Sequence, residues 1–495
     1  MSDPSDKKQK VIVEDFMTEE EEKLESTEKA TKDPANFEKS KENFDIEKIL
    51  SGFVLKKSLF IQQREGDISK YYNVDPEQIG EGAYGVVYKA TEITTGEIRA
   101  IKVIQKSKIK NYERFINEIT ALRTLDHPNV IKLYEMFEDE ENLHLVQEFC
   151  SGGELFDQIA EEDHFDEYKA AQIFEQILQS LIYCHKNKIC HRDLKPENFM
   201  FSCTGDSTVL KLIDFGLSRS FYVFQSTGEK ALLRMQTSAG TAFFMAPEVV
   251  LKNYSNSCDM WSAGVILYIM LSGYPPYDGE TQDEIFEAIL KGEVDFDDEV
   301  WKDITDEAKD LILNLLTTEE NRLTAKQALK HPWFKKSLGK KKRKEVNTTI
   351  LTRLQNFQNM NKMRKAILTF LASRVSSEDI EKQLKSFHIL DTNKDGYITM
   401  KELTKGLKDT HSTEQIQQIM NSVDTDKNGA IDYNEFIAAT LDAEIAKNLK
   451  KLDLAFKFFD KNSDGVIDKS DMGEALGGEE FKYAGSDIIR GMFRE

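Results

Sequence analysis

The sequence predicts an α+β domain followed by an all-α domain on one chain of 495 residues. Residues 75–105 alternate strand-like runs, rich in β-branched residues, with tight turns, whereas helical periodicity dominates from Tyr112 onward. Farther along the chain, acidic loops begin at Asp391, Asp424 and Asp460, at intervals of 33 and 36 residues. Such a repeat is typical of stacked helix–loop–helix units, so the second domain is expected to be helical.

The composition fits a globular protein with several domains. Apolar residues make up 40% of the chain, and its length predicts about three or four folded units. The 87 acidic and 66 basic side chains give a net charge of −21, which argues against general nucleic-acid binding and is compatible with acidic metal sites or basic partners. The five cysteines show no C-x-x-C spacing, so reduced cytoplasmic thiols are expected.

Residues 1–72 are predicted to form an N-terminal extension that is largely disordered, because most of it is polar and densely charged. Within it, residues 49–61 are apolar and are expected to dock on a later part of the chain. No secretory signal is visible, and the strongest apolar run, Val265–Leu271, is too short to cross a bilayer. Residue 2 is Ser2 and the first cysteine is Cys150, so no lipid anchor is expected. These features predict a cytoplasmic protein, for which entry into the nucleus stays open.

A glycine-rich run lies within the strand-like segment. Glycines allow the backbone of a strand–turn–strand unit to come close to phosphates, because no side chain stands between them. Dinucleotide-binding folds share this spacing, but there a helix follows the glycines, and here a strand follows. The nucleotide-binding candidates in this run are Gly80, Glu81, Gly82, Ala83, Tyr84 and Gly85.

Lys102 follows Gly85 by 17 residues and is flanked by strand residues. A cation at this place can grip the α- and β-phosphates of a nucleotide when a carboxylate holds it in position. Glu118, on a helical run, is the candidate carboxylate. Taken singly, each of the two is more often a solvated surface residue, so this pair alone does not decide between the two interpretations.

Two further motifs stand in the order and spacing that phosphoryl transfer requires: residues 191–198 (HRDLKPEN) and residues 214–216 (DFG). The chemistry needs a carboxylate that accepts the proton of a substrate hydroxyl, and two oxygen-bearing side chains that hold magnesium. Asp193 fits the first role, and Asn198 and Asp214 fit the second. A chance His-Arg-Asp in a charged loop does not explain the complete ordered set.

With these motifs, residues 73–334 resemble a eukaryotic protein kinase domain, which implies an α+β bilobal protein kinase fold. Residues 246–248 (APE) match the end of the activation segment, and residues 259–264 match the helix that anchors the catalytic loop. The resemblance also implies that Arg322 is buried and pairs with Glu248.

The resemblance implies phosphorylation of serine or threonine with ATP and magnesium, because Lys195 and Thr241 match the serine/threonine pattern. Lys195 would steady the transferring phosphate, and Thr241 would hydrogen-bond Asp193 and Lys195. The implied catalytic residues are Asp193, Lys195, Asn198, Lys102, Glu118 and Thr241. The residues implied to bind ATP, besides the glycine-rich run, are Ile79, Val87, Ala100, Lys102, the gatekeeper Gln147, the hinge residues Glu148 and Cys150, Met200 and Asp214.

Two glutamates, Glu154 and Glu197, match positions that receive arginines upstream of the phosphorylated residue in related kinases. They imply protein substrates with basic residues before the serine or threonine. The alternative is a pair of exposed glutamates without that role.

The acidic loops fit calcium-binding EF-hands. Such a loop places side-chain oxygens at positions 1, 3, 5 and 9, a backbone carbonyl at 7, a glycine at the sharp turn of position 6 and a bidentate glutamate at 12. The calcium ligands expected in the first loop are Asp391, Asn393, Asp395, Tyr397 and Glu402. Those expected in the second loop are Asp424, Asp426, Asn428, Ala430, Asp432 and Glu435.

A third loop supplies Asp460, Asn462, Asp464, Val466, Asp468 and Asp471. Its twelfth position is Asp471, one methylene shorter than glutamate, so weaker calcium binding or tolerance of magnesium is expected. One such loop alone could be an Asx-rich turn, but three in register argue against that. The next interval would begin after Glu495, so a fourth loop is missing. This predicts one of two things. Either the chain is a truncated four-loop protein, which is favoured, or the third EF-hand pairs with the junction or with another molecule.

Residues 335–375 are predicted to form an autoinhibitory junction. The basic cluster Lys340–Lys344 precedes one amphipathic helix, Ile350–Ala372, with apolar residues at helical spacing. A basic amphipathic helix suits the apolar groove that an EF-hand pair opens when calcium binds. A plain interdomain helix packed as core is the alternative.

The order of kinase domain, junction and an EF-hand domain over residues 376–495 resembles the calcium-dependent protein kinases of plants, ciliates and apicomplexan parasites. The resemblance implies a serine/threonine kinase that its junction inhibits until calcium binds the EF-hands. The chain departs from that family in its longer segment Asp214–Glu248 and in the missing fourth loop. A calcium sensor with an inert kinase domain is one alternative, against which the complete catalytic motifs speak. A kinase switched by separate calmodulin is the other, but EF-hands on the chain itself make separate calmodulin unnecessary.

Overall fold

The computed structural model describes residues 57–82, 85–109, 112–205, 209–224, 230–232, 235, 240–339, 346–467 and 469–476. Most of the predicted N-terminal extension lies outside these residues, as do the basic cluster Lys340–Lys344 and the site candidates Ala83, Tyr84 and Asp468. Within the described part of the chain, no helix combines the length and the apolar character needed to span a membrane.

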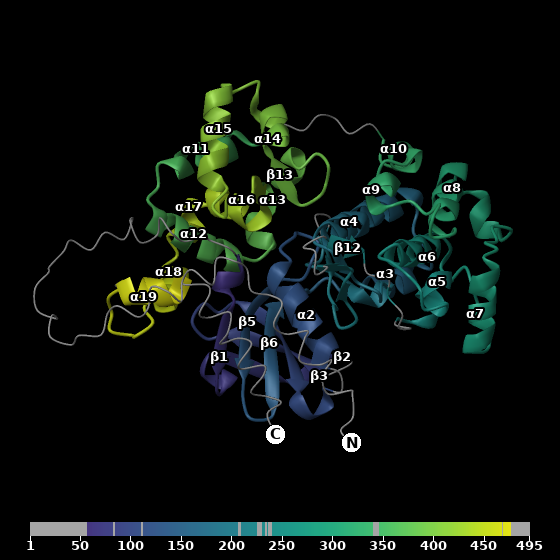
Figure 1. The fold of residues 1–495 in the computed structure, drawn as a ribbon, viewed down its shortest axis with the longest axis horizontal. Helices are drawn as coiled ribbons and strands as arrows, with labels where there is room; N and C mark the ends of the chain where they lie inside the picture. The colour runs from purple at the N-terminus through teal and green to yellow at the C-terminus, as the bar shows by residue number, and fades with distance from the viewer. Residues whose placement is uncertain are drawn as a thin grey trace, which may run out of the picture. The chain divides into compact units, whose positions relative to one another are not determined.

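The strand-rich half of the first domain is a six-stranded sheet (Figure 1). Its strands are β1 (Gln62–Glu65), β2 (Tyr72–Gly82), β3 (Gly85–Glu92), β4 (Ile98–Gln105), β5 (Leu133–Glu138) and β6 (Asn142–Glu148). Their order across the sheet is β1-β5-β6-β4-β3-β2, with β1 parallel to β5 and every other neighbouring pair antiparallel. The glycine-rich run joins β2 to β3, so it stands in the strand–turn–strand unit that the sequence predicted.

Helix α2 (Tyr112–Thr124) packs on one face of this sheet (Figure 1). Phe115, Ile119 and Leu122 recur at helical spacing and share a core with Leu145 of β6, so this stripe is the face of the helix that the sheet buries. The opposite face of the sheet has a small core of its own, formed by Ile68, Tyr72, Ala90, Ile101, Tyr134, Phe137 and Val146. Burial on both faces explains why β4 is apolar over most of its length.

Helices dominate the second half of this domain. They are α3 (Leu155–Glu162), α4 (Glu167–Lys186), α5 (Pro247–Val250), α6 (Cys258–Ser272), α7 (Gln282–Lys291), α8 (Asp306–Leu315), α9 (Ala325–Ala328) and α10 (Pro332–Ser337). Helix α6 is apolar on all sides and buried along almost its whole length, which is typical of a helix inside a core. It packs against α4 and α8 and so supports the loop that contains residues 191–198.

Short strands position the loops of the candidate site. They pair antiparallel as β7 (Ile189–Cys190) with β10 (Arg219–Ser220), β8 (Phe199–Phe201) with β9 (Leu210–Leu212), and β11 (Tyr222–Phe224) with β12 (Lys230–Leu232). The β11–β12 hairpin lies within the long segment Asp214–Glu248. One-turn 3₁₀ helices are η2 (Lys57–Phe60), η3 (Ile68–Lys70), η4 (Lys106–Lys108), η5 (Pro196–Asn198), η6 (Ala242–Phe244), η7 (Glu299–Lys302) and η8 (Glu378–Ile380).

The junction does not form the single helix that the sequence predicted. It forms α11 (Thr348–Gln358) and α12 (Lys362–Arg374), separated by residues 359–361. Asn361 ends the break, because its side chain accepts a hydrogen bond from the backbone N–H of Arg364 and caps α12. The apolar periodicity continues across the break, so periodicity alone did not reveal it.

The described part of the EF-hand region is helical except for one small sheet. Its helices are α13 (Glu381–Leu390), α14 (Met400–Leu407), α15 (Thr413–Val423), α16 (Tyr433–Thr440), α17 (Ala443–Ala446), α18 (Leu449–Phe459) and α19 (Lys469–Leu476). Strands β13 (Tyr397–Thr399) and β14 (Ala430–Asp432) pair antiparallel with Ile398 opposite Ile431. The first two acidic loops therefore form a pair of EF-hands.

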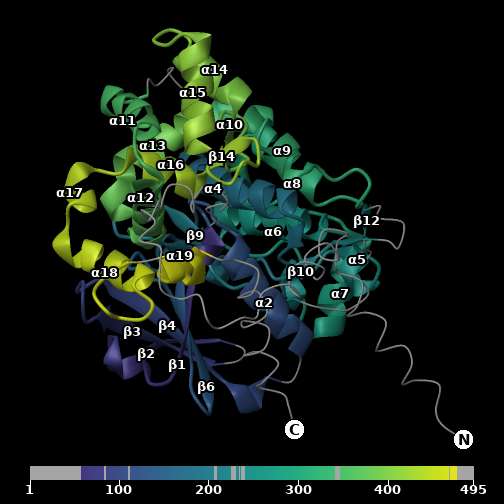
Figure 2. The same cartoon turned by 60° about the vertical axis from the view of Figure 1, so that its left-hand side comes forward.

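The junction helices fill the apolar face of this pair. Helix α11 packs against α15 and α16, and α12 lies between α16 and α18 (Figure 2). Phe60, at the described end of the apolar segment 49–61, packs against Phe370 of α12 and Phe458 of α18, so this end docks as the sequence predicted. The described buried apolar residues of the junction are Ile350, Leu354, Phe357, Ala366, Leu368, Phe370, Leu371, Ala372 and Val375.

Candidate active site and calcium loops

Lys102 lies at the centre of the candidate active site. Its Nζ on β4 is 2.5 Å from Oε1 of Glu118 on α2 and 3.5 Å from Oδ1 of Asp214. Burial disfavours the charge on Lys102, but the attraction of Glu118 and Asp214 outweighs it and raises the pKa of Lys102, so the ammonium stays protonated. That charge is the main cause of the lowered pKa of Asp214. The contact between Lys102 and Glu118 that the sequence predicted is present.

Asp193 is fixed by the segment that passes over it. Its Oδ1 accepts hydrogen bonds from the backbone N–H of Thr241, at 3.0 Å, and from the hydroxyl of Thr241, at 3.2 Å. Gly240 has φ of 117°, and a Cβ on it would stand 2.8 Å from a carbonyl oxygen of the catalytic loop, so this close passage requires glycine. Asn198 Nδ2 donates to the carbonyl oxygen of Asp193 at 2.7 Å. The predicted hydrogen bond between Thr241 and Asp193 is present, whereas one between Thr241 and Lys195 stays a prediction.

A buried carboxylate on α6 anchors the catalytic loop. Asp259 accepts hydrogen bonds from the backbone N–H groups of His191, at 2.9 Å, and Arg192, at 2.8 Å, and it pairs with Nε2 of His185 at 2.8 Å. Burial acts to raise the pKa of Asp259, but the bond from His185 and the other nearby donors outweigh it and lower that pKa. An ionised Asp259 therefore holds the loop that carries Asp193.

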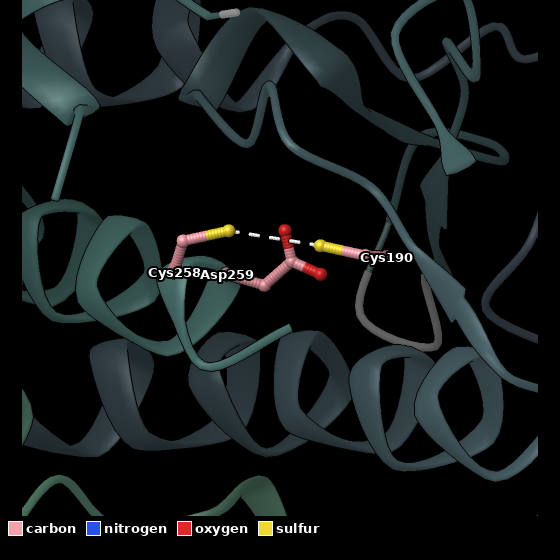
Figure 3. A group of neighbouring side chains, drawn as sticks. All are labelled: Cys190, Cys258 and Asp259. Atoms are coloured by element: carbon pink, nitrogen blue, oxygen red, sulfur yellow. Dashed lines mark hydrogen bonds between the residues drawn. The ribbon is translucent and has the colours of Figure 1, made fainter. Parts of the chain in front are cut away.

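Cys190 and Cys258 lie on either side of Asp259, with their sulfurs 3.6 Å apart (Figure 3). These three side chains have the proximity of a metal site, but their chemistry does not fit one. Burial raises the pKa of both thiols, whereas metals bind thiolates. The oxygens of Asp259 already accept hydrogen bonds from the catalytic loop and from His185. We interpret the cluster as structural support.

The far end of the activation segment is tied to the helical core. Both terminal nitrogens of the buried Arg322 donate to the Glu248 carboxylate, Nη2 to Oε2 at 3.1 Å. Arg322 also donates to the carbonyl oxygens of Ser257 and Thr317, at 3.0 and 2.8 Å. The pairing that the resemblance implied is therefore present, and it fixes the segment that begins at Asp214.

The sheet brings most of the predicted nucleotide-binding residues together. Val87 stands opposite Lys102 across β3 and β4, and Ala100 stands opposite Gln147 across β4 and β6. Met200 lies on β8, next to the start of α3. The other described candidates lie on β2, β3 and β6 or directly after β6, and they are Ile79, Gly80, Glu81, Gly82, Gly85, Glu148 and Cys150.

The side chain of Glu148 is held by residues that sequence reasoning missed. Its Oε2 is 2.9 Å from Nζ of Lys211, and its Oε1 accepts a hydrogen bond from the hydroxyl of Ser377 at 2.8 Å. Ser377 follows the junction, so the EF-hand region reaches the predicted hinge. No short motif marks such a contact, because the two partners are 229 residues apart.

Arg374, at the end of α12, was also missed. It pairs with Glu135 on β5, and both side chains are almost completely buried. Lys132 adds a hydrogen bond from its Nζ to the carbonyl oxygen of Ala372 at 2.9 Å. The sequence shows Arg374 only as a basic residue in the last turn of a helix, and this does not identify a partner 239 residues away.

Glu154 and Glu197 lie close enough to interact. Burial raises the pKa of Glu154, and the nearby charges of Asp157 and Glu197 raise it further. Among the described residues, the buried Oε2 of Glu197 has no hydrogen-bond partner. The nearby Lys195 offsets only part of these effects on Glu154, and two neighbouring carboxylates suit a basic group from another molecule.

The first calcium loop has the geometry of a cation site. Gly396 makes its turn at φ of 81°, and its N–H donates to Oδ2 of Asp391 at 2.9 Å. Glu402 reaches back across the loop, and its Oε1 accepts from the N–H of Asn393 at 3.0 Å. Burial raises the pKa of Asp391 to about 6, and the nearby carboxylates of Asp395 and Glu402 also act to raise it, so the loop gathers negative charge in an enclosed space. Asp395 and Tyr397 complete the predicted set in this loop.

The second loop repeats this arrangement. One carboxylate oxygen each from Asp424, Asp426 and Glu435 lies within 4.8 Å of the others. Gly429 makes the turn at φ of 89°. Burial, with the charge of Asp432, raises the pKa of Glu435 well above its usual value. Oxygen donors at this density fit calcium in both loops. The other predicted ligands of this loop, Asn428 and Ala430, lie between Asp426 and Asp432.

The third loop is closed by its shorter acid. Oδ1 of Asp471 accepts hydrogen bonds from the N–H groups of Lys461, at 3.0 Å, and Asn462, at 3.3 Å. Gly465 donates its N–H to Oδ2 of Asp460 at 3.0 Å. The loop therefore takes the EF-hand shape in its described part, which also contains Asp464 and Val466.

We expect a calorimetric calcium titration of the chain to show two sites in the micromolar sensor range, roughly 10⁻⁷–10⁻⁵ M, and a weak or absent third. The reason is the single missing methylene at Asp471, which shortens the reach of the twelfth ligand. Asp471→Glu should strengthen the third site and leave the first two unchanged. Three equally tight sites in the unsubstituted monomer would contradict this expectation.

Comparisons with known proteins agree with both parts of the chain. Residues 73–334 match the protein kinase domain family, residues 381–441 match the EF-hand domain pair, and residues 452–476 match the EF hand family. The chain is 38% identical over 458 residues to calcium-dependent protein kinase 5 of Plasmodium falciparum (isolate 3D7). The aligned region covers 91% of this chain and 78% of that protein. The chain is 40% identical over 418 residues to calcium-dependent protein kinase 3 of Plasmodium yoelii yoelii, with 83% and 76% covered. It is 40% identical over 419 residues to calcium-dependent protein kinase 14 of Arabidopsis thaliana, with 83% and 77% covered.

Proposed function

Because this chain belongs to the calcium-dependent protein kinase family and is a calcium-activated protein kinase, we propose that it phosphorylates serine or threonine in basic-flanked proteins under the control of its own junction. The observation that carries the catalytic part is the position of Lys102 Nζ, which contacts both Glu118 and Asp214. This contact joins the sheet, α2 and the start of the activation segment into one site.

In this proposal the chain's own residues divide the catalytic work. Lys102, held by Glu118, binds the α- and β-phosphates of ATP. Asp193, held by Thr241, orients the substrate hydroxyl and accepts its proton, and Lys195 steadies the transferred phosphate. Since Asp193 is fixed before the substrate arrives, little reorganisation is needed at the moment of transfer.

Magnesium is the second part of the proposal. Asn198 and the ionised Asp214 are the oxygen-bearing side chains that would hold it, and their chemistry fits a hard cation. A bound magnesium ion would neutralise charge that develops on the phosphates. Phosphate transfer to matched serine, threonine and tyrosine peptides, each with and without magnesium, tests both points. Transfer to tyrosine, or an equal rate without divalent cation, would contradict the proposal.

Substrate preference is the third part. We propose that Glu154 and Glu197 receive arginines that precede the phosphorylated residue, because these two acids lie together and the nearby Lys195 offsets only part of the rise in the pKa of Glu154. The preference for arginine two or three residues before the serine should fall about three- to thirtyfold in kcat/KM when Glu154→Gln and Glu197→Gln are combined. Peptides with and without that arginine, compared in one assay, give the ratio. Glu161→Gln, near the C-terminal end of α3, is the control. An unchanged preference in the double variant would remove Glu154 and Glu197 from the role.

Autoinhibition by the junction is the fourth part. The apolar residues of α11 and α12 are buried against the first EF-hand pair. These are the residues that a calcium-loaded pair would bind. This fit supports a junction that calcium holds on the EF-hand pair and that inhibits the kinase domain when the calcium-free pair releases it. The same fit supports activation without separate calmodulin, because the chain's own EF-hand pair provides the groove that binds the junction helices. We also propose that the enzyme acts in the cytoplasm.

A further inference from the structure

The first calcium loop is packed on the kinase domain at its glycine turn, where the other two loops are open. A Cβ on Gly396, the sixth residue of that loop, would stand 2.4 Å from Cδ2 of Tyr183 and 2.8 Å from Cδ2 of His127. The equivalent point on Gly429 or Gly465 has no atom within 4 Å. At this turn, therefore, the first loop lies directly against α4, whereas the second and third are open.

The seventh residue of the loop strengthens this contact. The ring of Tyr397 stacks on that of Tyr183 with centroids 5.6 Å apart, and its hydroxyl donates to Oδ1 of Asn187 at 3.1 Å. Position 7 offers calcium only its backbone carbonyl, so the side chain is free to bind another surface. The second and third loops carry the small residues Ala430 and Val466 there.

Lys186 connects α4 to a predicted calcium ligand. Its Nζ lies 2.8 Å from Oδ2 of Asp395, the fifth residue of the loop, and 4.0 Å from the centroid of the Tyr397 ring. The other oxygen of Asp395 accepts the N–H of Tyr397 at 3.2 Å. One carboxylate oxygen of Asp395 thus bonds within the loop, while the other contacts the positively charged ammonium of Lys186 on the kinase domain.

We propose that Lys186 shares the Asp395 carboxylate with calcium and thereby lowers the calcium affinity of the first EF-hand while that loop is docked on α4. The inference rests on the proposed role of Asp395 as a calcium ligand. A fixed ammonium on a ligand carboxylate repels a divalent cation and withdraws charge from the site. By linkage, calcium in this loop weakens its contact with α4 by the same factor. The kinase domain would then help to set the calcium threshold of its own sensor.

Lys186→Met should lower the calcium dissociation constant of the first site about three- to tenfold, a modest change because the Lys186 side chain is 41% exposed and partly screened. The affinity is measured by competition with a chromophoric chelator on the full chain, in a Glu435→Gln background that silences the second site. Lys326→Met, which removes an exposed charge elsewhere in the kinase domain, is the matched control and should change nothing.

An unchanged or weaker first site in Lys186→Met, or an equal gain in Lys326→Met, would overturn the inference. Asp395→Ala, which removes the ligand oxygens, separates this failure from a failure of the underlying assignment. If Asp395→Ala weakens the first site but Lys186→Met has no effect, only the sharing with Lys186 is wrong. If Asp395→Ala has no effect either, Asp395 is not a calcium ligand, and both fail. In the double variant Lys186→Met with Asp395→Ala, the gain from Lys186→Met should largely disappear.

Discussion

Asp193→Asn is expected to lower kcat by about 10²–10⁴-fold, the usual contribution of a general base. Asparagine keeps an oxygen that can accept the two hydrogen bonds from Thr241, so the loop should retain its position. It cannot accept a proton from the substrate hydroxyl, because its second group is an amide NH₂. The loss should therefore fall on turnover and leave ATP binding nearly unchanged.

Steady-state kinetics and ATP binding by calorimetry measure the two quantities separately. Asp303→Asn makes the same chemical change at an exposed position of the kinase domain and should behave as the unsubstituted enzyme. Lys102→Met should differ from both, because it removes the phosphate contact and leaves the buried carboxylate of Glu118 without its partner. Near-normal turnover in Asp193→Asn would show that the assigned mechanism is wrong.

Combining Glu402→Gln with Glu435→Gln should give a full-length enzyme that stays inhibited at micromolar calcium. Each substitution removes the bidentate ligand of one loop in the first EF-hand pair, while the amide keeps an acceptor for the backbone N–H groups that the carboxylate now binds. Without calcium in this pair, its hold on α11 and α12 should weaken, so the junction stays free to inhibit the kinase domain. The rate of peptide phosphorylation against free calcium measures the effect. Glu414→Gln with Glu444→Gln makes the same charge change outside the loops and should leave activation intact.

Deletion of everything after Phe334 should give activity that no longer responds to calcium, because inhibitor and sensor are both removed. The level of that activity is a separate matter. Deletion also removes Arg374 and Ser377, which bind the side chains of Glu135 and Glu148. We therefore expect lost calcium dependence together with turnover below that of the fully activated chain. A double-glutamine variant that still activates, or a deleted chain that still responds to calcium, would refute control through the first pair.

Sequence reasoning worked best where function depends on residues close together in the chain. The HRDLKPEN run fixes Asp193 and Asn198 five residues apart, and each calcium loop spans twelve positions. Such spacings are set by the local backbone and are therefore visible as patterns. The contact between Lys102 and Glu118 was also predicted, because each lies on an element with a recognisable period.

Contacts between distant segments were not predictable in this way. Arg374 and Glu135 are 239 residues apart, and burial of their ion pair depends on how two domains dock. The same holds for Lys186 and Asp395, which are 209 residues apart. The break between α11 and α12 was missed for a different reason. Apolar residues continue on both sides of Asn361, and the capping hydrogen bond that starts α12 has only a weak sequence signal.

Calcium control of catalysis is tested most directly by the transfer of phosphate from ATP to a serine peptide with upstream arginine. The rate is compared with calcium, with chelator, and with calcium plus added calmodulin. A high rate with calcium, a rate near background with chelator and no further effect of calmodulin are predicted. An equal rate in chelator, or a requirement for calmodulin, would contradict the account of a kinase that its own EF-hands activate.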